Sequence, residues 1–431
     1  MAHRAIAGDR AHAPAELPKG RNPCGRNHGH AVVKAEPKAD DGDDRHGGTL
    51  PSAAWLDSAA RRILDAAWRD DVEGGGHSVP NPTTYPWQWL WDSCFHTVVW
   101  AHLGDPRGVS ELTSALANQH DDGFVPHLQY GTGPVPHAAL WGRSDASSIT
   151  QPPMYGHAAR VLLEHGFALD DDVLRRARRG LRFLLYERRR SPEGLVELCH
   201  PWESGCDDSP RWDDVVAGRW TPSAWFERKG ALVAAIERSP SGSAVFNPEF
   251  AVGSVGFSAL VAWNARELAP LIGDAQMQTD ANALTAAVAA RWDASLCSWV
   301  DDGPTSAGSG RVRTLDALLP LLVCPRDEAF DQLVDPVAFG ALFGPTGVHR
   351  AEPTFAASTY WRGPVWPQLT YLLWLAATSS RRPEVARSLS SSMIRGAVSS
   401  GFAEYWNADT GAGRGARPQS WTSLAAAVRT R

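Results

Sequence analysis

The sequence predicts an all-α fold in which helix hairpins close into a toroid, with long functional loops gathered on one face. Apolar residues recur at the spacing of amphipathic helices along most of the chain, whereas the alternation typical of strands is weak. Long loops rich in aromatic residues, Gly and Pro separate successive helices. Helices paired end to end, with unusual chemistry in alternate loops, are expected to pack as a ring around one core.

The predicted helices begin after residue 50 and follow one another to the end of the chain. Each is supported by apolar residues three or four positions apart. In chain order these segments are residues 53–68, 94–103, 108–119, 155–166, 172–187, 250–272, 281–292, 315–322, 365–377, 384–394 and 421–428. The loops between them span residues 79–92, 124–153, 200–222, 353–366 and 401–415.

The first 49 residues differ in composition from the rest of the chain. They are rich in Pro, Gly, His and Asp and have no periodic apolar pattern, which is typical of a disordered extension. Cys24, His28 and His30 form an incomplete ligand set, so we favour a solvated tail over a metal site there. No linker divides residues 50–431, and we expect one domain.

Charge and cysteine usage exclude several classes of protein. The net charge of −6 argues against a nucleic-acid binder, and the arginine-dense run from Arg175 to Arg190 is interpreted as one helical face. No apolar run is long enough to cross a membrane. The six cysteines are scattered without a CxxC pair, and no signal-peptide core precedes them, so we expect free thiols in a cytoplasmic protein.

The most informative segment is residues 202–212, WESGCDDSPRW, which places Glu203, Asp207 and Asp208 between two tryptophans. Carboxylates beside indole rings suit sugar hydrolysis. One carboxyl must stay protonated against an apolar wall, and a second must stay ionised across the sugar ring. A partner carboxylate is therefore expected elsewhere in the chain.

Two further acids are candidates for the second role. Glu404 precedes an aromatic pair and a Gly-rich turn in GFAEYWNADTGAGRG. Asp92 ends the aromatic run YPWQWLWD, and its carboxylate is suited to binding sugar hydroxyls. Asp is also a favoured helix cap, so a cap for a helix beginning near Ser93 stays an alternative for Asp92.

Tryptophans gather in the same loops as these acids. An indole offers an apolar face to the C–H groups of a sugar and an N–H to a hydroxyl, although any single one is equally explained by core packing. The tryptophans in or beside the loops are Trp87, Trp89, Trp91, Trp202, Trp212, Trp361, Trp366, Trp406 and Trp421.

Six motifs in order carry a resemblance to a known family. They are QWLWDSCFH, GFVPHLQY, SSITQPP, WESGCDDSPRW, TYWRGPVWP and GFAEYWNADTGAGRGARPQSWTSL. The chain resembles, over about residues 50–431, the glucosylglycerate and mannosylglycerate hydrolases of glycoside hydrolase family 63, which are related to the trehalases and to processing α-glucosidase. The resemblance implies an (α/α)6 barrel and cleavage of an α-glycosidic bond with inversion.

The resemblance also implies roles for individual residues. Asp207 corresponds to the general acid and Glu404 to the general base, with their carboxyls roughly 6.5–9.5 Å apart so that a water fits between. Asp208 stands where relatives commonly have Asn, and only Asp207 keeps the motif register. The implied substrate-binding residues are Tyr85, Trp89, Trp91, Asp92, His127, Gln151, Glu203, Tyr360, Trp361, Arg362, Gly363, Trp366 and Trp421.

Some of these residues have structural alternatives. Arg362 is also able to pair with a buried carboxylate, His127 to be a satisfied loop histidine, and Glu203 to support its loop together with Asp208. These assignments rest on motif position, which is an associational argument.

The leaving group is left open by the sequence. Recognition of an anionic glycerate is expected to require an arginine that binds the carboxylate with two hydrogen bonds. The candidate partners Arg228, Lys229 and Arg238 lie outside any motif. The leading hypothesis is an enzyme that releases hexose and glycerate from glucosylglycerate or mannosylglycerate. The alternatives are a trehalase-like enzyme for a neutral di- or oligosaccharide and a non-catalytic sugar-binding protein. We expect a small-molecule substrate, no cofactor and no metal, since two carboxylates supply acid and base.

Overall fold

The computed structural model describes residues 49–71, 75–131, 138–143, 145–216, 220–303 and 311–429. The predicted extension, including the alternative metal ligands Cys24, His28 and His30, lies outside the described residues apart from Thr49.

Helices dominate the described chain. The α-helices are α1 (Ala53–Ala67), α2 (Leu90–His102), α3 (Arg107–Ala115), α4 (Ala138–Trp141), α5 (Tyr155–Glu164), α6 (Asp171–Arg182), α7 (Pro222–Ala234), α8 (Val255–Ile272), α9 (Ala275–Ala290), α10 (Asp327–Val334), α11 (Pro367–Ser379) and α12 (Pro383–Ser399). A π-helix, η2 (Phe183–Glu187), extends α6, and 3-10 helices are η3 (Pro201–Ser204), η4 (Pro210–Val215), η6 (Leu315–Leu322) and η7 (Ser420–Ala426).

The strands are two or three residues long and pair only as antiparallel ribbons within the described chain. The pairs are β1 (Trp68–Asp70) with β2 (Gly76–Ser78), β3 (Gln88–Trp89) with β4 (Leu128–Gln129), β5 (Glu197–Leu198) with β8 (Val252–Gly253), β6 (Glu237–Arg238) with β7 (Ala244–Phe246), β9 (Trp292–Asp293) with β10 (Ser298–Trp299) and β11 (Tyr405–Trp406) with β12 (Gly413–Arg414). They fasten loops together rather than forming a core.

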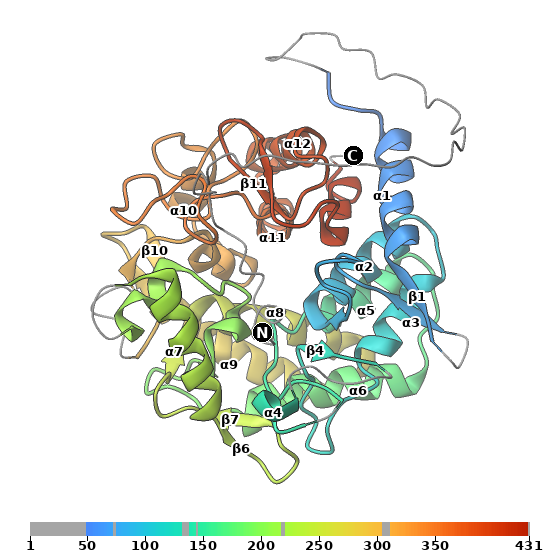
Figure 1. Cartoon of the computed structure of the whole chain (residues 1–431), viewed down its shortest axis with the longest axis vertical. Helices are drawn as coiled ribbons and strands as arrows, with labels where there is room; N and C mark the ends of the chain where they lie inside the picture. Colours follow the sequence, from blue (N-terminus) through green and yellow to red (C-terminus); the bar gives the residue numbers. More distant parts are fainter. Residues whose placement is uncertain are drawn as a thin grey trace, which may run out of the picture.

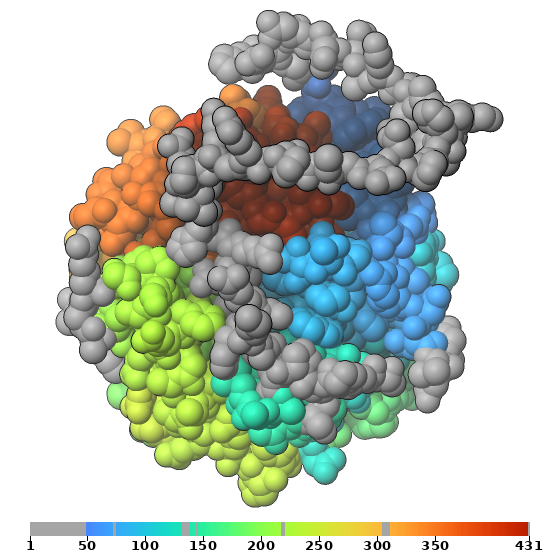
Figure 2. All heavy atoms as spheres, in the orientation of Figure 1, coloured from blue at the N-terminus to red at the C-terminus, as the bar shows by residue number. Residues whose placement is uncertain are grey.

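The elements follow one another around a ring in sequence order (Figure 1). An inner layer closes on itself, because α2 packs on α5, α5 on α8, α8 on η6, η6 on α11, α11 on η7 and η7 again on α2. Outer helices cover it: α3 packs on α2, α9 on α8, α12 on α11 and α1 on η7. The C-terminal segment accordingly lies against the N-terminal helices on the molecular surface (Figure 2). The predicted fold class is confirmed.

Burial patterns explain which helices lie inside. Helices α2, α8 and α11 are buried over most of their length, as expected for helices that are apolar all round. Outer helix α9 buries only a stripe at helical spacing, made of Met277, Ala281, Leu284 and Val288. The position of each helix in the ring therefore follows from its apolar pattern.

Some local predictions need correction. Residues 315–322 and 421–428 were expected to be ordinary helices, but η6 and η7 are 3-10 helices, and η6 contains Pro320, which cannot donate the helical hydrogen bond. The arginine-dense run is not one helical face, because α6 ends at Arg182 and Arg188 turns inward to a buried carboxylate. Helices α4, α7 and α10 were not predicted.

The fold places one set of loops at the N-terminal ends of the inner elements. Asp92 lies in the first turn of α2, Gln151 just before α5, Trp361 just before α11 and Gln419 just before η7. None of the described helices is both long enough and apolar enough to cross a bilayer.

Candidate active site

A cavity of about 530 Å³, including its open mouth, lies among these loops. Carboxylates and aromatic rings share its wall. The lining residues are Pro80, Tyr85, Trp89, Trp91, Asp92, His127, Gln151, Trp202, Gly205, Asp207, Tyr360, Trp361, Glu404, Gln419 and Trp421. Segments from both ends of the described chain therefore build one site.

Asp207 lies on the turn between η3 and η4 and faces the cavity. Its carboxylate accepts a hydrogen bond from the Tyr360 hydroxyl. Burial in apolar surroundings raises the pKa of Asp207 to about 8, despite the nearby Lys229 ammonium, which opposes this rise. A carboxyl with this pKa is largely protonated at neutral pH, as a general acid must be.

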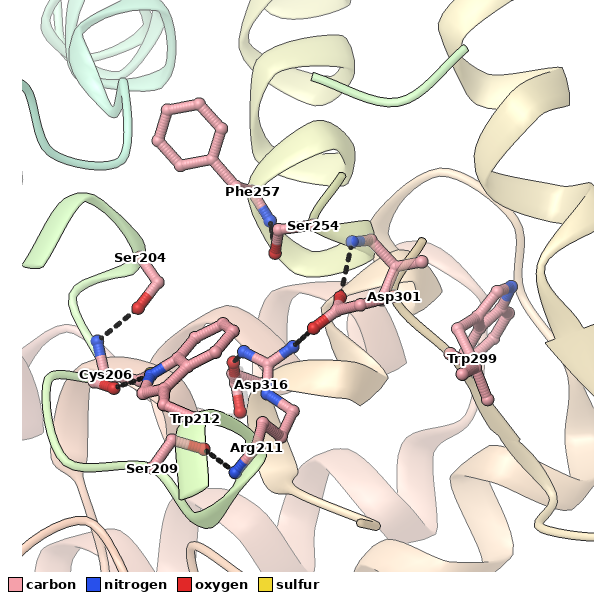
Figure 3. Close-up of polar contacts among 12 residues, drawn as sticks. Ser204, Cys206, Ser209, Arg211, Trp212, Ser254, Phe257, Trp299, Asp301 and Asp316 are labelled. Atoms are coloured by element: carbon pink, nitrogen blue, oxygen red, sulfur yellow. Dashed lines mark hydrogen bonds and ion pairs between the residues drawn. The ribbon is translucent and has the colours of Figure 1, made fainter. Parts of the chain in front are cut away.

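The turn that carries Asp207 is fastened on both sides (Figure 3). Before it, the Ser204 hydroxyl accepts a hydrogen bond from Cys206 N–H, and the Trp212 indole donates to Cys206 O at 2.9 Å. After it, the buried Arg211 guanidinium pairs with the carboxylates of Asp301 and Asp316. A buried ion pair adds little net stability, but loss of one partner would leave an uncompensated buried charge beside the turn.

Asp301 connects this anchor to the inner ring. Its second carboxylate oxygen accepts the N–H of Val255 at 2.9 Å, in the first turn of α8, while Ser254 caps that helix by accepting from Phe257 N–H. The loop of Asp207 is thus tied to the start of an inner helix.

Gly205 lets the turn approach the cavity wall. Its φ of 73° lies in the left-handed region, and a Cβ there would stand 2.5 Å from the Trp91 ring. Trp91 in turn meets the Trp421 ring edge to face, with centroids 5.8 Å apart. Close contact between the acid loop and the indole wall requires glycine at this position.

Gly205→Ala is expected to destabilise the protein by about 1–3 kcal/mol more than Gly104→Ala, because overpacking adds to the cost of positive φ. Gly104 is the matched control, since its φ is 68° and a Cβ there would meet nothing within 4 Å. Urea unfolding of the two variants measures the difference. Equal destabilisation of the two variants would show that the Trp91 ring moves aside with no loss in the free energy of unfolding.

Glu404 precedes β11, is only 3% exposed and faces the same cavity. The Tyr85 hydroxyl lies 3.2 Å from both carboxylate oxygens and donates to them, and Ala416 N–H donates to Oε2 at 2.9 Å. Burial nevertheless raises the pKa of Glu404 to about 7. The same carboxylate leaves no room for a side chain at Gly415, where a Cβ would stand 2.3 Å from Oε2.

Asp92 is buried in the first turn of α2 and lines the cavity. The cap position of this helix belongs to Trp89, and no side chain caps it, so the alternative in which Asp92 is the helix cap is contradicted. Its Oδ1 has no hydrogen-bond partner. Burial, aided by the nearby Glu404 carboxylate, raises the pKa of Asp92 well above its ordinary value.

Other buried polar atoms of the wall also lack partners. They are Trp89 Nε1, Trp202 Nε1, Trp361 Nε1 and Gln419 Oε1. Buried polar groups are normally hydrogen-bonded, so a cluster of unpartnered donors and acceptors around one cavity indicates a polar ligand. Indole faces beside these groups fit a sugar, which is apolar on its C–H face and polar at its rim.

His127 and Gln151 support this wall. His127 Nδ1 lies 2.5 Å from the Ser147 hydroxyl, and burial lowers the pKa of His127 to about 3, so the ring is neutral. Its ring meets the Trp89 indole edge to face. Gln151 Oε1 accepts the N–H of Trp91 at 3.3 Å. His127 is thus a satisfied neutral histidine that also borders the cavity.

Four sequence-predicted substrate residues do not line the cavity. Glu203 is fully buried, and its carboxylate accepts hydrogen bonds from both terminal guanidinium nitrogens of Arg188. It also accepts hydrogen bonds from the backbone N–H groups of Cys199 and Thr150. Arg362 pairs with Asp213, which is the structural alternative considered for it. Gly363 packs against the backbone of Ala356. Trp366 is buried and its ring stacks on that of Trp361, with the ring centroids 3.6 Å apart. These residues support the wall from behind.

Four lining residues were absent from the predicted set: Pro80, Trp202, Gly205 and Gln419. Trp202 and Gly205 belong to the motif of Asp207, and Gln419 precedes the motif tryptophan Trp421, so position beside a motif residue was the available signal. Pro80 carried no signal, because its place depends on Ser420 N–H bonding to its carbonyl.

The cations considered for an acidic leaving group are engaged elsewhere. Arg228 donates to Glu249 and to Val215 O, Lys229 to Asp208, and Arg238 to Ser148 and nearby carbonyls. The described lining contains neither Arg nor Lys. Across the described residues, no three His, Cys, Asp or Glu side chains gather as a metal site would require.

Known proteins are similar to this chain in sequence and in fold. Residues 85–422 match the family described as the mannosylglycerate hydrolase MGH1-like glycoside hydrolase domain. Glucosylglycerate hydrolase of Mycolicibacterium hassiacum is 28% identical over 428 residues, which cover 81% of this chain and 93% of the relative. Mannosylglycerate hydrolase of Thermus thermophilus is 28% identical over 412 residues, covering 83% and 97%.

Solved structures of glycoside hydrolases resemble this fold. A family 63 mannosylglycerate hydrolase from Thermus thermophilus, in complex with Tris and D-glycerate, has a TM-score of 0.75 at 26% identity and covers 86% of this chain and 99% of that chain. Neutral trehalase of Saccharomyces cerevisiae shares the fold alone, with a TM-score of 0.51 at 12% identity, covering 88% and 79%.

Proposed function

The chain belongs to the mannosylglycerate hydrolase MGH1-like glycoside hydrolase family, and we therefore propose that it hydrolyses a glycosylglycerate with inversion, releasing hexose and glycerate from glucosylglycerate or mannosylglycerate. One observation carries the proposal. Asp207 and Glu404, both acids whose pKa burial raises, face a single cavity whose indoles and unpartnered polar atoms suit a sugar.

In this proposal Asp207 is the general acid. Its protonated carboxyl donates the proton to the glycosidic oxygen as the bond to the anomeric carbon breaks, so the leaving group departs as an alcohol. Tyr360 holds the carboxyl by its hydrogen bond, and Gly205 and Arg211 hold the turn. After the step the carboxylate is stabilised by Lys229 nearby.

Glu404 is the general base. Its carboxylate removes a proton from a water that attacks the anomeric carbon from the opposite face, which inverts the configuration. The Tyr85 hydroxyl and Ala416 N–H each donate to the ionised form, and both therefore orient it. The proton balance closes when Glu404 passes its proton to solvent and Asp207 regains one.

The pH profile of kcat/KM is expected to be a narrow bell. The base works only when ionised, so activity should rise as pH passes about 7, the pKa of Glu404, and the acid works only when protonated, so activity should fall as pH passes about 8, the pKa of Asp207. Initial rates measured at subsaturating substrate across this range test the prediction. A plateau extending well beyond both limbs would contradict it.

Asp92 is assigned to sugar binding. Its unpartnered buried Oδ1 would accept a hydroxyl of the sugar, and a buried hydroxyl left without its hydrogen-bond partner costs about 1–3 kcal/mol. Asp92→Ala, which removes this acceptor, is therefore expected to lower kcat/KM by about 10–100-fold, because a sugar hydroxyl loses its partner. Kinetics equal to those of the wild type would remove Asp92 from the site.

The substrate class is tested by hexose release. The purified protein is incubated with glucosylglycerate, mannosylglycerate, trehalose and a kojibiose-type disaccharide, and NMR follows the anomer first released. Initial β-hexose from an α-glycosylglycerate supports the proposal. Preference for the neutral disaccharides would favour the trehalase-like alternative, which agrees with a described cavity lining that holds no Arg or Lys. Binding without release would instead favour a sugar-binding protein.

The proposal places the enzyme in the cytoplasm. Its support is the free thiols of Cys94, Cys199, Cys206, Cys297 and Cys324, which suit a reducing compartment.

A further inference from the structure

A largely buried ion pair lies directly beside Asp207. Lys229 Nζ donates to Asp208 Oδ1 at 2.7 Å, and the side chains of these residues are 4% and 16% exposed. The same oxygen accepts the Trp225 indole N–H at 2.8 Å. A surface ion pair is worth little, but burial makes each charge depend on its partner.

Helix α7 presents both donors. Trp225 and Lys229 are four residues apart and therefore lie on one face of the helix. The Trp225 indole lies within reach of a second acceptor, Asp207 O, at 3.3 Å. The Lys229 carbonyl accepts His200 Nε2 at 3.0 Å, and His200 caps η3, which leads into the turn. One helix thus contacts the acid turn at its start and at the acid itself.

We propose that the Lys229–Asp208 ion pair is a further positioning element of the general acid, which holds the Asp207 turn against α7 and sets the upper pH limit of activity. The inference deepens the proposed function and rests on the assignment of Asp207 as the acid. Lys229 acts through Asp207 and does not line the cavity, so it is a positioning residue rather than a catalytic one.

Within the described residues, several charged or titratable groups act on Asp207 or lie beside it. These are Lys229 from α7, Asp208 and Cys206 from its own turn, Tyr360 from the loop before α11, Glu404 from the segment before β11 and Tyr85 from the loop before β3. Lys229 is the only cation in this set, and Asp208 is the nearest carboxylate in sequence. Lys229 therefore lowers the pKa of Asp207, whereas Asp208 raises it.

The two single variants should consequently move the basic limb in opposite directions. Asp208→Asn leaves the cation unbalanced, favours ionised Asp207 and is expected to shift the basic limb of kcat/KM down by about one pH unit. Lys229→Met removes the cation and is expected to shift the limb up by a similar amount. The double variant should return near the wild-type limb, and Lys229→Arg should keep it.

Arg228→Met is the matched control. Arg228 directly precedes Lys229 on α7 and makes an ion pair with Glu249 instead, so its loss should leave the basic limb in place. Thermal unfolding of every variant checks that the fold is retained.

A second measurement separates this inference from the proposed substrate. The titration of the Asp207 carboxyl carbon is followed by ¹³C NMR in the free protein, with Asp207→Asn used to assign the signal. Opposite displacements of that titration in the two single variants support the inference even when no tested glycoside is hydrolysed. Shifts in the same direction, or unmoved titrations in folded variants, overturn it.

Discussion

Asp207→Asn is expected to lower kcat for an α-glycosylglycerate by about 10³–10⁴-fold, because the amide cannot protonate the departing oxygen. The side chain keeps its volume, and its neighbours Tyr360 and Trp225 still have an oxygen and a backbone carbonyl to bond. Sugar affinity and the free energy of unfolding should therefore change little. Steady-state kinetics, together with calorimetric binding of the product hexose, measure both effects.

A substrate with a good leaving group tests the assigned role. An α-glycosyl fluoride needs little protonation to depart, so Asp207→Asn should retain much more activity toward the fluoride than toward the natural glycoside. The basic limb of the pH profile should also disappear, since no acid remains to titrate. Equal loss toward both substrates would assign Asp207 to binding or structure instead of proton donation.

Glu404→Gln is expected to cause a loss of similar size, about 10³-fold or more, but toward both kinds of substrate. The attacking water must lose a proton whichever group departs, so a good leaving group gives no relief. Tyr85 and Ala416 donate to the wild-type carboxylate, and an amide that keeps one oxygen can accept only part of these bonds. The acidic limb of the pH profile should vanish in this variant.

The comparison of the two variants is more informative than either alone. A fluoride that rescues Asp207→Asn and not Glu404→Gln would identify acid and base separately. The reverse pattern would exchange the two roles. Near-normal turnover in the Glu404 variant would show that another group activates the water.

Much of the fold was predictable because its inner helices are long and apolar. The apolar run of 365–377 predicted α11, and that of 94–103 predicted most of α2. Helix α7 was missed because its apolar residues show only a weak helical periodicity. A lysine is also among its buried residues, which are Trp225, Lys229, Leu232 and Val233. The burial of that lysine depends on Asp208, a contact that sequence spacing does not reveal.

The site was predictable to the extent that motif residues face the cavity. Tyr85, Trp89 and Tyr360 line it as the family motifs implied. Glu203 does not, because a carboxylate in a tryptophan-flanked motif looks the same in sequence whether it meets a sugar or an arginine. Its partner is Arg188, which the sequence pattern assigned, with its arginine neighbours, to one helical face.

Closure of the ring by η7 has a consequence for biosynthesis. Tyr85 and Glu404 are 319 residues apart, and His96 meets Ser420 across 324 residues. Contacts this distant in sequence form slowly, and chains emerge from the ribosome from the N-terminus at about 5–20 residues per second. The nascent chain therefore has no complete sugar pocket until Trp421 has been translated, and the apolar flanks of α2 and α11 stay uncovered until then. The enzyme should become active in one late step, and earlier intermediates are expected to be clients of chaperones.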